Sequence, residues 1–378
     1  MFEHLLSRSE INLFILISCS FLSVLLIRKF GITPGGVLPS GLFVLLFLRD
    51  PPWALLILLA SISIYLISRS FLFSSEGLTS VFFCGIFLLL FLLVFEIYGV
   101  FSSLVFLLSG TLLIVFIFGS LSGNFALNIF QQERFNLDYM QFGLAIVIAF
   151  VILQIYPVSY LQAGGLMIAP VLSRNCMRNG FNSTFFGFLA CAASGLAISY
   201  CIINVAELFG TNAALSINHG QILEPYYVKV IPYLAIISLI IGAISSKVYN
   251  VRAGGYILAP FAAQIISDTN GLLILLLGVL FTVSFQALLI ERLTWMIGLS
   301  RYLFVLIISS LYSIIVCGQY IALGHSVFIV ANTWIIALII HGTSNDIIVY
   351  GRKAVPLIVL NFGLTYFALK IFEVVPFA

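Results

Sequence analysis

Long apolar runs alternate with short polar or glycine- and proline-rich breaks along almost the whole chain. A run of about 17 or more apolar residues is long enough for an α-helix to cross the hydrocarbon layer of a membrane. The pattern predicts about ten such spans, at 11–27, 52–68, 78–98, 100–121, 139–156, 183–206, 226–246, 271–290, 302–319 and 355–373. We therefore expect an all-α, polytopic integral membrane protein.

Four further apolar stretches follow hinges of small residues and are mostly too short to cross. They cover 37–48, 164–172, 254–266 and 324–340, of which the last is just long enough to span. Two hinges are near-copies, because 163–170 and 253–260 both read A-G-G-x-x-x-A-P. Irregular backbone is tolerated in a membrane only where it packs on protein or lines a cavity. The four stretches are therefore predicted to be short re-entrant or half-helix elements.

The order of these elements indicates an internal duplication. Residues 1–206 and 226–378 each contain a span, a hinge, a short element, further spans, a second hinge, a second short element and a final span, and the polar linker 207–225 joins them. The first repeat carries an extra helix pair near 78–121. Copies of the same orientation predict two parallel-related repeats, with all four hinges on one membrane face.

Composition agrees with lipid as the main solvent. The chain is 62% hydrophobic and only 8% charged, with a mean hydropathy of +1.22, whereas soluble domains carry about 25% charged residues. The net charge of +3 is too small to indicate a nucleic-acid partner. The six cysteines lie mostly in apolar runs without CxxC spacing, so neither a metal site nor a disulfide framework is expected, and no cofactor.

The first and last hinges carry a family resemblance. Residues 31–41 read G-I-T-P-G-G-V-L-P-S-G, while 321–324 read I-A-L-G and precede A-N-T at 331–333. These motifs resemble the hinges of the membrane subunit of poly-γ-glutamate capsule synthesis, the PgsC/CapC family. This chain departs from the family in its greater length, in the early position of Pro39, and in His325, where the family has an aliphatic residue.

The resemblance implies a role beside an enzyme. The family's membrane subunit partners a cytoplasmic ATP-dependent amide ligase and other capsule-complex membrane subunits, and helps to elongate or export an anionic polymer across the bacterial inner (cytoplasmic) membrane. The chain has no P-loop, no GxSxG, no HExxH and no paired carboxylates at helical spacing. It is therefore not expected to be an enzyme itself.

The predicted substrate path consists of the hinge glycines and two neighbours. Broken helices expose backbone N–H groups and helix N-termini, which attract carboxylates; close packing of small residues is the alternative interpretation. The residues are Gly35, Gly36, Gly164, Gly165, Arg252, Gly254, Gly255, Gly324 and His325.

Basic residues beside the hinges form a second candidate set, the basic collar. A polyanion would be drawn to these charges, although setting topology and contacting lipid headgroups is the usual role of such residues. Their excess on the hinge side favours a cytoplasmic location for that face. The collar comprises Arg28, Lys29, Arg174, Arg178, Lys247, Arg352 and Lys353.

Polar side chains within or beside the apolar stretches have mainly a structural interpretation. His325 and His341 could titrate near neutral pH, but we expect hydrogen-bonded structural histidines. Gln154, Asn204, Gln286 and Asn361 are expected to bond between helices.

Two other functions fit the same pattern. A stand-alone secondary transporter of a small organic anion would also use repeated broken helices, although the apolar spans contain few ionisable groups for proton coupling. An assembly scaffold without a permeation path is the third possibility.

Overall fold

A computed structural model describes residues 8–31, 34–72, 160–165, 168–208, 225–251, 258–290, 299–322 and 333–374. Every regular element within these ranges is helical, and they contain no strand, which confirms the predicted all-α class. The predicted spans 78–98, 100–121 and 139–156, and nearly all of the linker, lie outside the described residues.

Several helices have the length and composition of membrane spans. The described residues include five such stretches: Ile11–Phe30, Phe181–Val205, Thr269–Leu288, Leu299–Cys317 and Thr333–Glu373. They lie in α1 (Arg8–Phe30), α9 (Phe181–Leu208), α13 (Thr269–Ile290), α14 (Leu299–Ala322), and the pair α16 (Thr333–Tyr350) and α17 (Ala354–Val374), which η2 (Gly351–Lys353) joins. α3 (Pro51–Leu72) and α11 (Pro225–Tyr249) contain shorter apolar stretches.

The outer faces of these helices are apolar as well. Along α13, Leu276, Leu280 and Leu288 are each at least 60% exposed, and Val359 and Phe367 of α17 are similarly exposed. Water would strongly disfavour such surfaces, whereas lipid tails solvate them. The chain is therefore a multi-pass membrane protein.

Four short helices stand beside the long ones. They are α2 (Pro39–Arg49), α7 (Tyr160–Gly165), α8 (Ile168–Asn179) and α12 (Leu258–Ile266). Short helices occur after the first and third hinges as predicted, in α2 and α12, while their re-entrant character stays a prediction. The predicted end of the second at residue 172 is wrong, because α8 continues to Asn179 and carries Arg174 and Arg178 within a helix rather than in a loop.

The fourth short element was predicted at 324–340, but the described helix there, α16, runs from Thr333 to Tyr350. The predicted element ended at residue 340, where the polar residues 341–346 begin. In the structure His341, Ser344 and Asp346 are buried among neighbouring helices. Away from water, the backbone at these residues must satisfy its own hydrogen bonds, so it remains helical.

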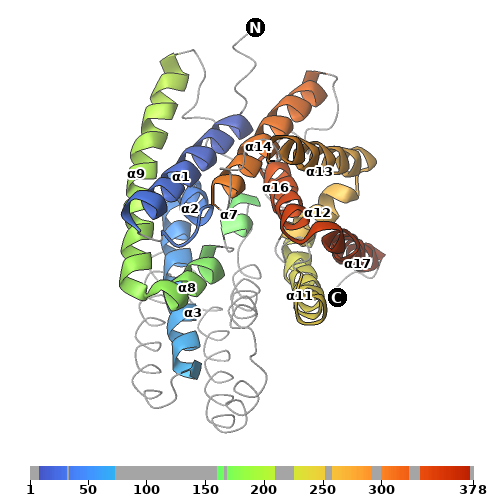
Figure 1. Cartoon of the computed structure of the whole chain (residues 1–378), viewed down its shortest axis with the longest axis horizontal. Helices are drawn as coiled ribbons and strands as arrows, with labels where there is room; N and C mark the ends of the chain where they lie inside the picture. Colours follow the sequence, from blue (N-terminus) through green and yellow to red (C-terminus); the bar gives the residue numbers. More distant parts are fainter. Residues whose placement is uncertain are drawn as a thin grey trace.

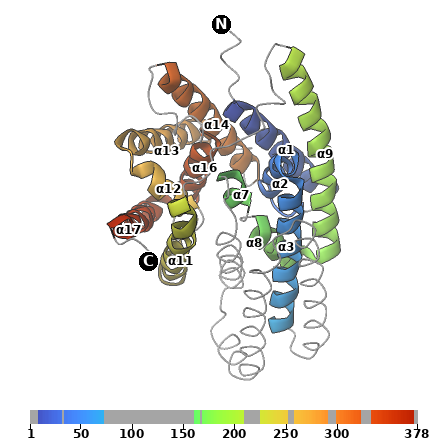
Figure 2. The ribbon, with the colours of Figure 1, turned by 180° about the vertical axis from the view of Figure 1, so that it is seen from behind.

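The short helices α2 and α12 have corresponding neighbours. α2 packs on α1 before it, α3 after it, and α7, α8 and α9; α12 packs on α11 before it, α13 after it, and α16 and α17. Figures 1 and 2 show the first set on one side of the molecule and the second set on the other, with α7 and α16 toward the middle. The correspondence fits the two-repeat interpretation, which stays a prediction.

An aspartate cap follows both short helices. The backbone N–H of Trp53 donates to Oδ1 of Asp50 at 3.2 Å, and that of Asn270 donates to Oδ1 of Asp268 at 3.1 Å. In each case an aspartate caps the start of the next long helix, because its side chain accepts a hydrogen bond from an N–H that the helix cannot satisfy.

Helix α16 connects the two sets of helices. It packs on α12, α13, α14 and α17, and also on α1. At its first turn, Trp334 lies 3.1 Å from the position that a Cβ on Gly164 of α7 would occupy. All residues from Thr333 to His341 are buried, so the first half of α16 is enclosed on every side and belongs to the central core.

Close approach of α13 to α16 depends on Gly278. A Cβ at this position would lie 2.7 Å from Cε1 of Tyr312 and would also meet the end of Ile340. The ring hydroxyl of Tyr312 donates to the carbonyl oxygen of Ile274 at 3.1 Å, which fixes the ring beside this glycine. The three helices α13, α14 and α16 therefore meet where α13 carries no side chain.

Replacing Gly278 with valine is expected to destabilise the folded protein by about 1–3 kcal/mol, the usual cost of overpacking a core. The thermal midpoint of detergent-solubilised protein, followed by size-exclusion chromatography, measures the change. Gly363→Ala on α17 is the matched control, because nothing lies within 4 Å of its Cβ position. A Gly278→Val midpoint equal to that of Gly363→Ala would contradict the packing described for these helices.

Candidate substrate path

The first hinge is a glycine turn pressed against α8 and α9. Gly35 and Gly36 have φ values of 67° and 120°, which L side chains rarely adopt. A Cβ on Gly35 would lie 2.5 Å from Cδ1 of Leu172 and 3.3 Å from the ring of Phe188. Both the backbone conformation and the lack of space therefore require glycine at position 35.

Asn175 of α8 holds this turn in place through hydrogen bonds. Its Nδ2 donates to the carbonyl oxygens of Gly35, at 2.8 Å, and Val171, at 2.9 Å. The hydroxyl of Thr184 in α9 donates to the carbonyl oxygen of Asn175 at 3.3 Å. One amide side chain thus joins the hinge before α2 to the junction of α8 and α9.

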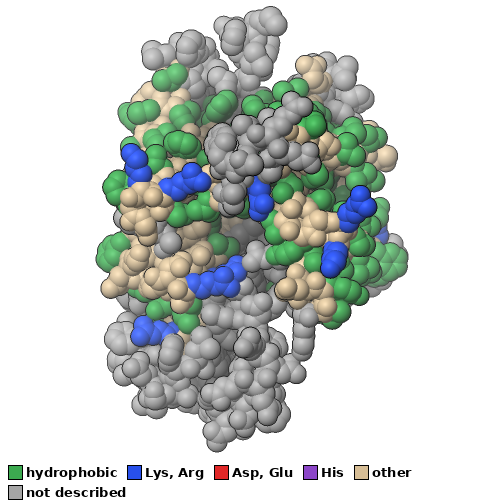
Figure 3. All heavy atoms as spheres, in the orientation of Figure 1, with side chains coloured by type: hydrophobic (Ala, Val, Ile, Leu, Met, Phe, Trp, Pro, Cys, Tyr) green, Lys and Arg blue, Asp and Glu red, His purple; other side chains and the backbone are tan. Residues whose placement is uncertain are grey.

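Four members of the basic collar flank this hinge. Arg28 and Lys29 occupy the last turn of α1, directly before the hinge, and both are exposed. Arg174 and Arg178 lie on either side of Asn175, the first half-buried and the second exposed. Figure 3 shows Lys and Arg side chains on one face of the molecule, where no acidic side chain of the described residues is visible.

The other three residues of the basic collar are two that lie in η2 and one whose side chain is not described. Arg352 and Lys353 are exposed in η2, which packs on α16 and α17. The side chain of Lys247 lies outside the described residues, as do Arg252, Gly254, Gly255, Gly324 and His325. Their proposed roles stay predictions.

The second hinge is also closely packed and lies elsewhere along α2. Gly164 and Gly165 are the last residues of α7, so these glycines are helical. A Cβ on Gly165 would lie 2.9 Å from both Ile57 and Leu46, and Leu46 stands near the C-terminal end of α2. Gly35 and Gly36 precede the N-terminal end, so the structure does not bring the two glycine pairs together.

A polar junction holds α7 to the turn between α2 and α3. Nε2 of Gln162 donates to Oδ2 of Asp50 at 2.7 Å, and Nε1 of Trp53 donates to the carbonyl oxygen of Gln162 at 3.2 Å. Burial lowers the pKa of the neighbouring Arg49 guanidinium, an effect that the Asp50 carboxylate partly offsets. Asp50 therefore both caps α3 and positions the second hinge.

Two buried side chains differ from their expected roles. His341 and Gln286 were expected to be hydrogen-bonded inside the helix bundle, but neither ring nitrogen of His341 and neither end of the Gln286 amide has a hydrogen-bond partner. Both side chains are 1% exposed. The sequence offers one signal for unpaired polar groups here: His341 and Ser344 stand three residues apart, on one face of an apolar helix.

Comparison of the chain with models of protein families, with curated proteins and with solved structures returns no match. The described residues contain no group of three or more His, Cys, Asp or Glu side chains that could hold a metal ion.

Gly35→Ala is expected to lower stability more than Gly31→Ala, although both glycines have similar positive φ values of 67° and 63°. Each substitution carries the left-handed backbone strain of about 1 kcal/mol. Only Gly35→Ala adds a clash, because nothing lies within 4 Å of the Cβ position at Gly31. Thermal midpoints of the two purified variants give the comparison, and equal losses would mean that the hinge does not press on Leu172.

Asp50→Ala is expected to cost more stability than Asp268→Ala. Loss of an N-cap costs about 0.5–2 kcal/mol in either variant, but Asp50→Ala also removes the acceptor of the Gln162 amide. The free energy of unfolding of each variant in detergent, compared with that of wild type, measures the difference. Asp268→Ala serves as the matched control, and a larger loss there would contradict the junction at α7.

Proposed function

We propose that this protein is a non-catalytic membrane subunit of a complex that makes and exports an anionic polymer of the poly-γ-glutamate kind. Its location would be the bacterial inner (cytoplasmic) membrane, beside an ATP-dependent amide ligase and further membrane subunits. The observation that supports this most is the glycine hinge before α2 with four basic residues around it. The hinge motif is also the one that resembles the family.

The chemistry of the hinge suits carboxylates. The first N–H groups of α2 follow Gly36, and a helix N-terminus carries partial positive charge. Arg28 and Lys29 approach from α1, and Arg174 and Arg178 from α8. These four cations would attract the repeated carboxylates of a polyanion without a deep, tight pocket. Weak, repeated contacts of this kind suit a polymer that must keep moving.

A partner enzyme follows from this role. The sequence contains no phosphate-binding loop and no nucleophile motif, so amide bonds would be formed by the ligase on the cytoplasmic side. Purified protein alone would then have no synthetase activity, and its contribution would be to accept the growing chain at the hinge.

A second candidate function, a secondary transporter of a small organic anion, gains support from His341. Proton-coupled carriers need an ionisable group inside the membrane, and such a group is a functional candidate by default. His341 is a buried, titratable side chain on the central helix α16. Small anions would meet the same basic hinge, so surface polymer and uptake must be assayed separately.

Deletion of the gene in its native host is expected to remove a glutamate-rich polymer from the cell surface. Complementation with wild type should restore it, while Arg174→Ala combined with Arg178→Ala should restore about a tenth or less, as loss of electrostatic guidance of an anion predicts. Surface polymer is measured by acid hydrolysis and amino-acid analysis, and membrane abundance of each variant by immunoblotting.

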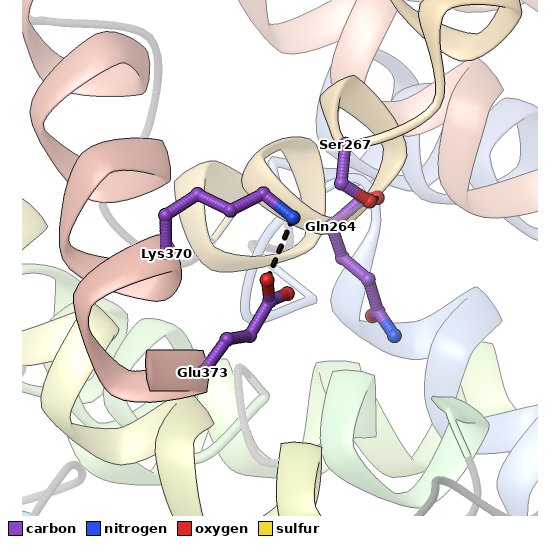
Figure 4. A network of polar contacts seen from close by, with 4 residues as sticks. All are labelled: Gln264, Ser267, Lys370 and Glu373. Carbon is purple, nitrogen blue, oxygen red and sulfur yellow. Dashed lines mark hydrogen bonds and ion pairs between the residues drawn. The ribbon is translucent and has the colours of Figure 1, made fainter. Parts of the chain in front are cut away.

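Lys370→Ala is the matched control, because Lys370 is also basic and lies near the C-terminal end of α17, where it pairs with Glu373 at 2.7 Å. Figure 4 shows this pair beside Gln264 of α12 and Ser267, which follows that helix. Full complementation by the Arg174/Arg178 double variant at normal abundance would refute the role of the hinge. An unchanged surface after deletion would refute the polymer function and leave uptake of small anions to be assayed.

A further inference from the structure

The contact region of α13, α14 and α16 contains buried polar side chains without partners. More than nine in ten buried polar groups in proteins have a hydrogen-bond partner. Here the side-chain polar atoms of Thr282, Gln286, His341 and Ser344 have none, and none of these side chains is more than 1% exposed. The three helices pack on one another pairwise. Four unpaired polar side chains in one contact region of a membrane protein indicate a role beyond packing.

These groups face the contact between the helices. Gly278 touches Tyr312 of α14 and Ile340 of α16, and Thr282 and Gln286 follow it at four-residue intervals, which places them along the same face of α13. On α16, His341 follows Ile340, and Ser344 stands one turn further. The ring of Tyr302 in α14 meets the His341 ring edge to face, with centroids 4.3 Å apart.

Tyr302 does not replace a hydrogen-bond partner for His341. An aromatic ring accepts at most a weak contact from an N–H group, and a neutral imidazole also has a nitrogen that needs a donor. The amide of Gln286 likewise offers two donors and an acceptor. The available groups therefore suit a ligand that can both donate and accept hydrogen bonds.

The ionisable groups on the neighbouring helices determine which charge a ligand at this place can carry. Helix α13 contains no Asp, Glu, Lys, Arg or His, and neither does α12, which touches α16 through Leu258 and Gly342. α14 contains Arg301 at its first turn, Tyr302, Tyr312, Tyr320 and Cys317. α16 itself adds Tyr350 and Asp346, which lies about 140° around the helix from His341, and η2, which packs on the end of α16, adds Arg352 and Lys353. The ionisable groups of α1 and α17 are Arg8, Glu10, Cys19, Arg28, Lys29, Tyr366, Lys370 and Glu373, and Lys370 is paired with Glu373.

We propose that α13, α14 and α16 enclose a carboxylate-binding site within the membrane, in which His341 holds a proton that accompanies the carboxylate and Gln286 donates a hydrogen bond to it. An unpaired carboxylate is costly in a low-dielectric interior. His341 supplies the missing charge by taking one proton from water, and its N–H then donates to a carboxylate oxygen. One proton and one carboxylate enter together, so the site gains no net charge.

This inference deepens the proposed function and rests on the passage of carboxylates through the protein. The basic hinge attracts the anion at the surface, and the site at His341 receives a carboxylate when α13, α14 and α16 move apart. Polymer carboxylates and small organic acids share this chemistry. The test therefore uses two probes, a γ-linked glutamate tetramer and succinate.

Binding of each probe to the full-length protein in lipid nanodiscs is measured by equilibrium dialysis between about pH 5.5 and about pH 7.5, on either side of the ordinary imidazole value. Wild type should bind at least one probe, with Kd rising by up to about tenfold per pH unit as His341 loses its proton. His341→Gln keeps hydrogen-bonding capacity but should bind weakly and without pH dependence. Gln286→Leu should weaken binding at every pH and keep the slope.

Ser313→Ala is the matched control, because Ser313 is fully buried in α14 but bonds its own helix, to the carbonyl oxygen of Ser309 at 2.8 Å. It should bind as wild type does. A second measurement needs no variant: deuterium exchange at Cε1 of the histidines, followed by mass spectrometry, should slow several-fold at His341 when the probe binds and remain unchanged at His4 and His219.

The proposal is overturned if His341→Gln keeps the wild-type pH slope, or if neither probe changes exchange at His341, in which case the polar groups have only a structural role. Its failure is separable from that of the proposed function. Loss of surface polymer on gene deletion, with pH-independent binding, would leave the polymer function standing without this site. Binding of succinate alone through His341, with an unchanged cell surface, would support the site and assign it to a small-anion transporter.

Discussion

Satisfaction of backbone hydrogen bonds inside lipid is the constraint on which this structure depends. A chain that is 62% hydrophobic can place most side chains against lipid, but its peptide groups find no water there and must bond within helices. Departures from regular helix are then possible only where protein surrounds them. The hinge before α2 follows this rule, because Gly35 is pressed on α8 and α9.

The same constraint explains where polar chemistry collects. At the hinge before α2, Asn175 satisfies the carbonyl oxygen that the turn leaves unpaired, and charged side chains stand at the adjoining helix ends, near water. Deeper inside, α16 keeps helical geometry through a run of polar residues because neighbouring helices enclose it. The hinge and the centre of α16 are therefore two different environments for an anion, the first offering fixed charge and the second a titratable group.

The sequence predicted much of the fold, because apolar length is a strong signal in a membrane protein. The bounds of α1, α9, α13 and α17 follow closely from their apolar runs. The prediction failed where burial depends on distant residues. A polar stretch such as 341–346 has the composition of a loop, and only packing against α13 and α14 makes it helical.

The candidate site was predictable in part for the same reason. Glycine at 35 and 36 and the cations beside them are local features, and the hinge motif marks them. Asn175 has no local signal, since its role depends on a contact across 140 residues of chain. The repeated A-G-G motif indicated broken helices, yet Gly164 and Gly165 end a helix and pack closely. At the second hinge, the glycines of this motif therefore serve close helix packing.

Site-specific photo-cross-linking in the native host tests the central claim, that the hinge guides an anionic polymer, most directly. A photoreactive amino acid replaces Arg178, beside the hinge, in one strain and Lys370, on α17, in another, and polymer attached to the protein is detected after irradiation. The account predicts attachment at position 178 and little at position 370. Equal attachment at both positions, or none at position 178 in a strain that still makes polymer, would contradict it.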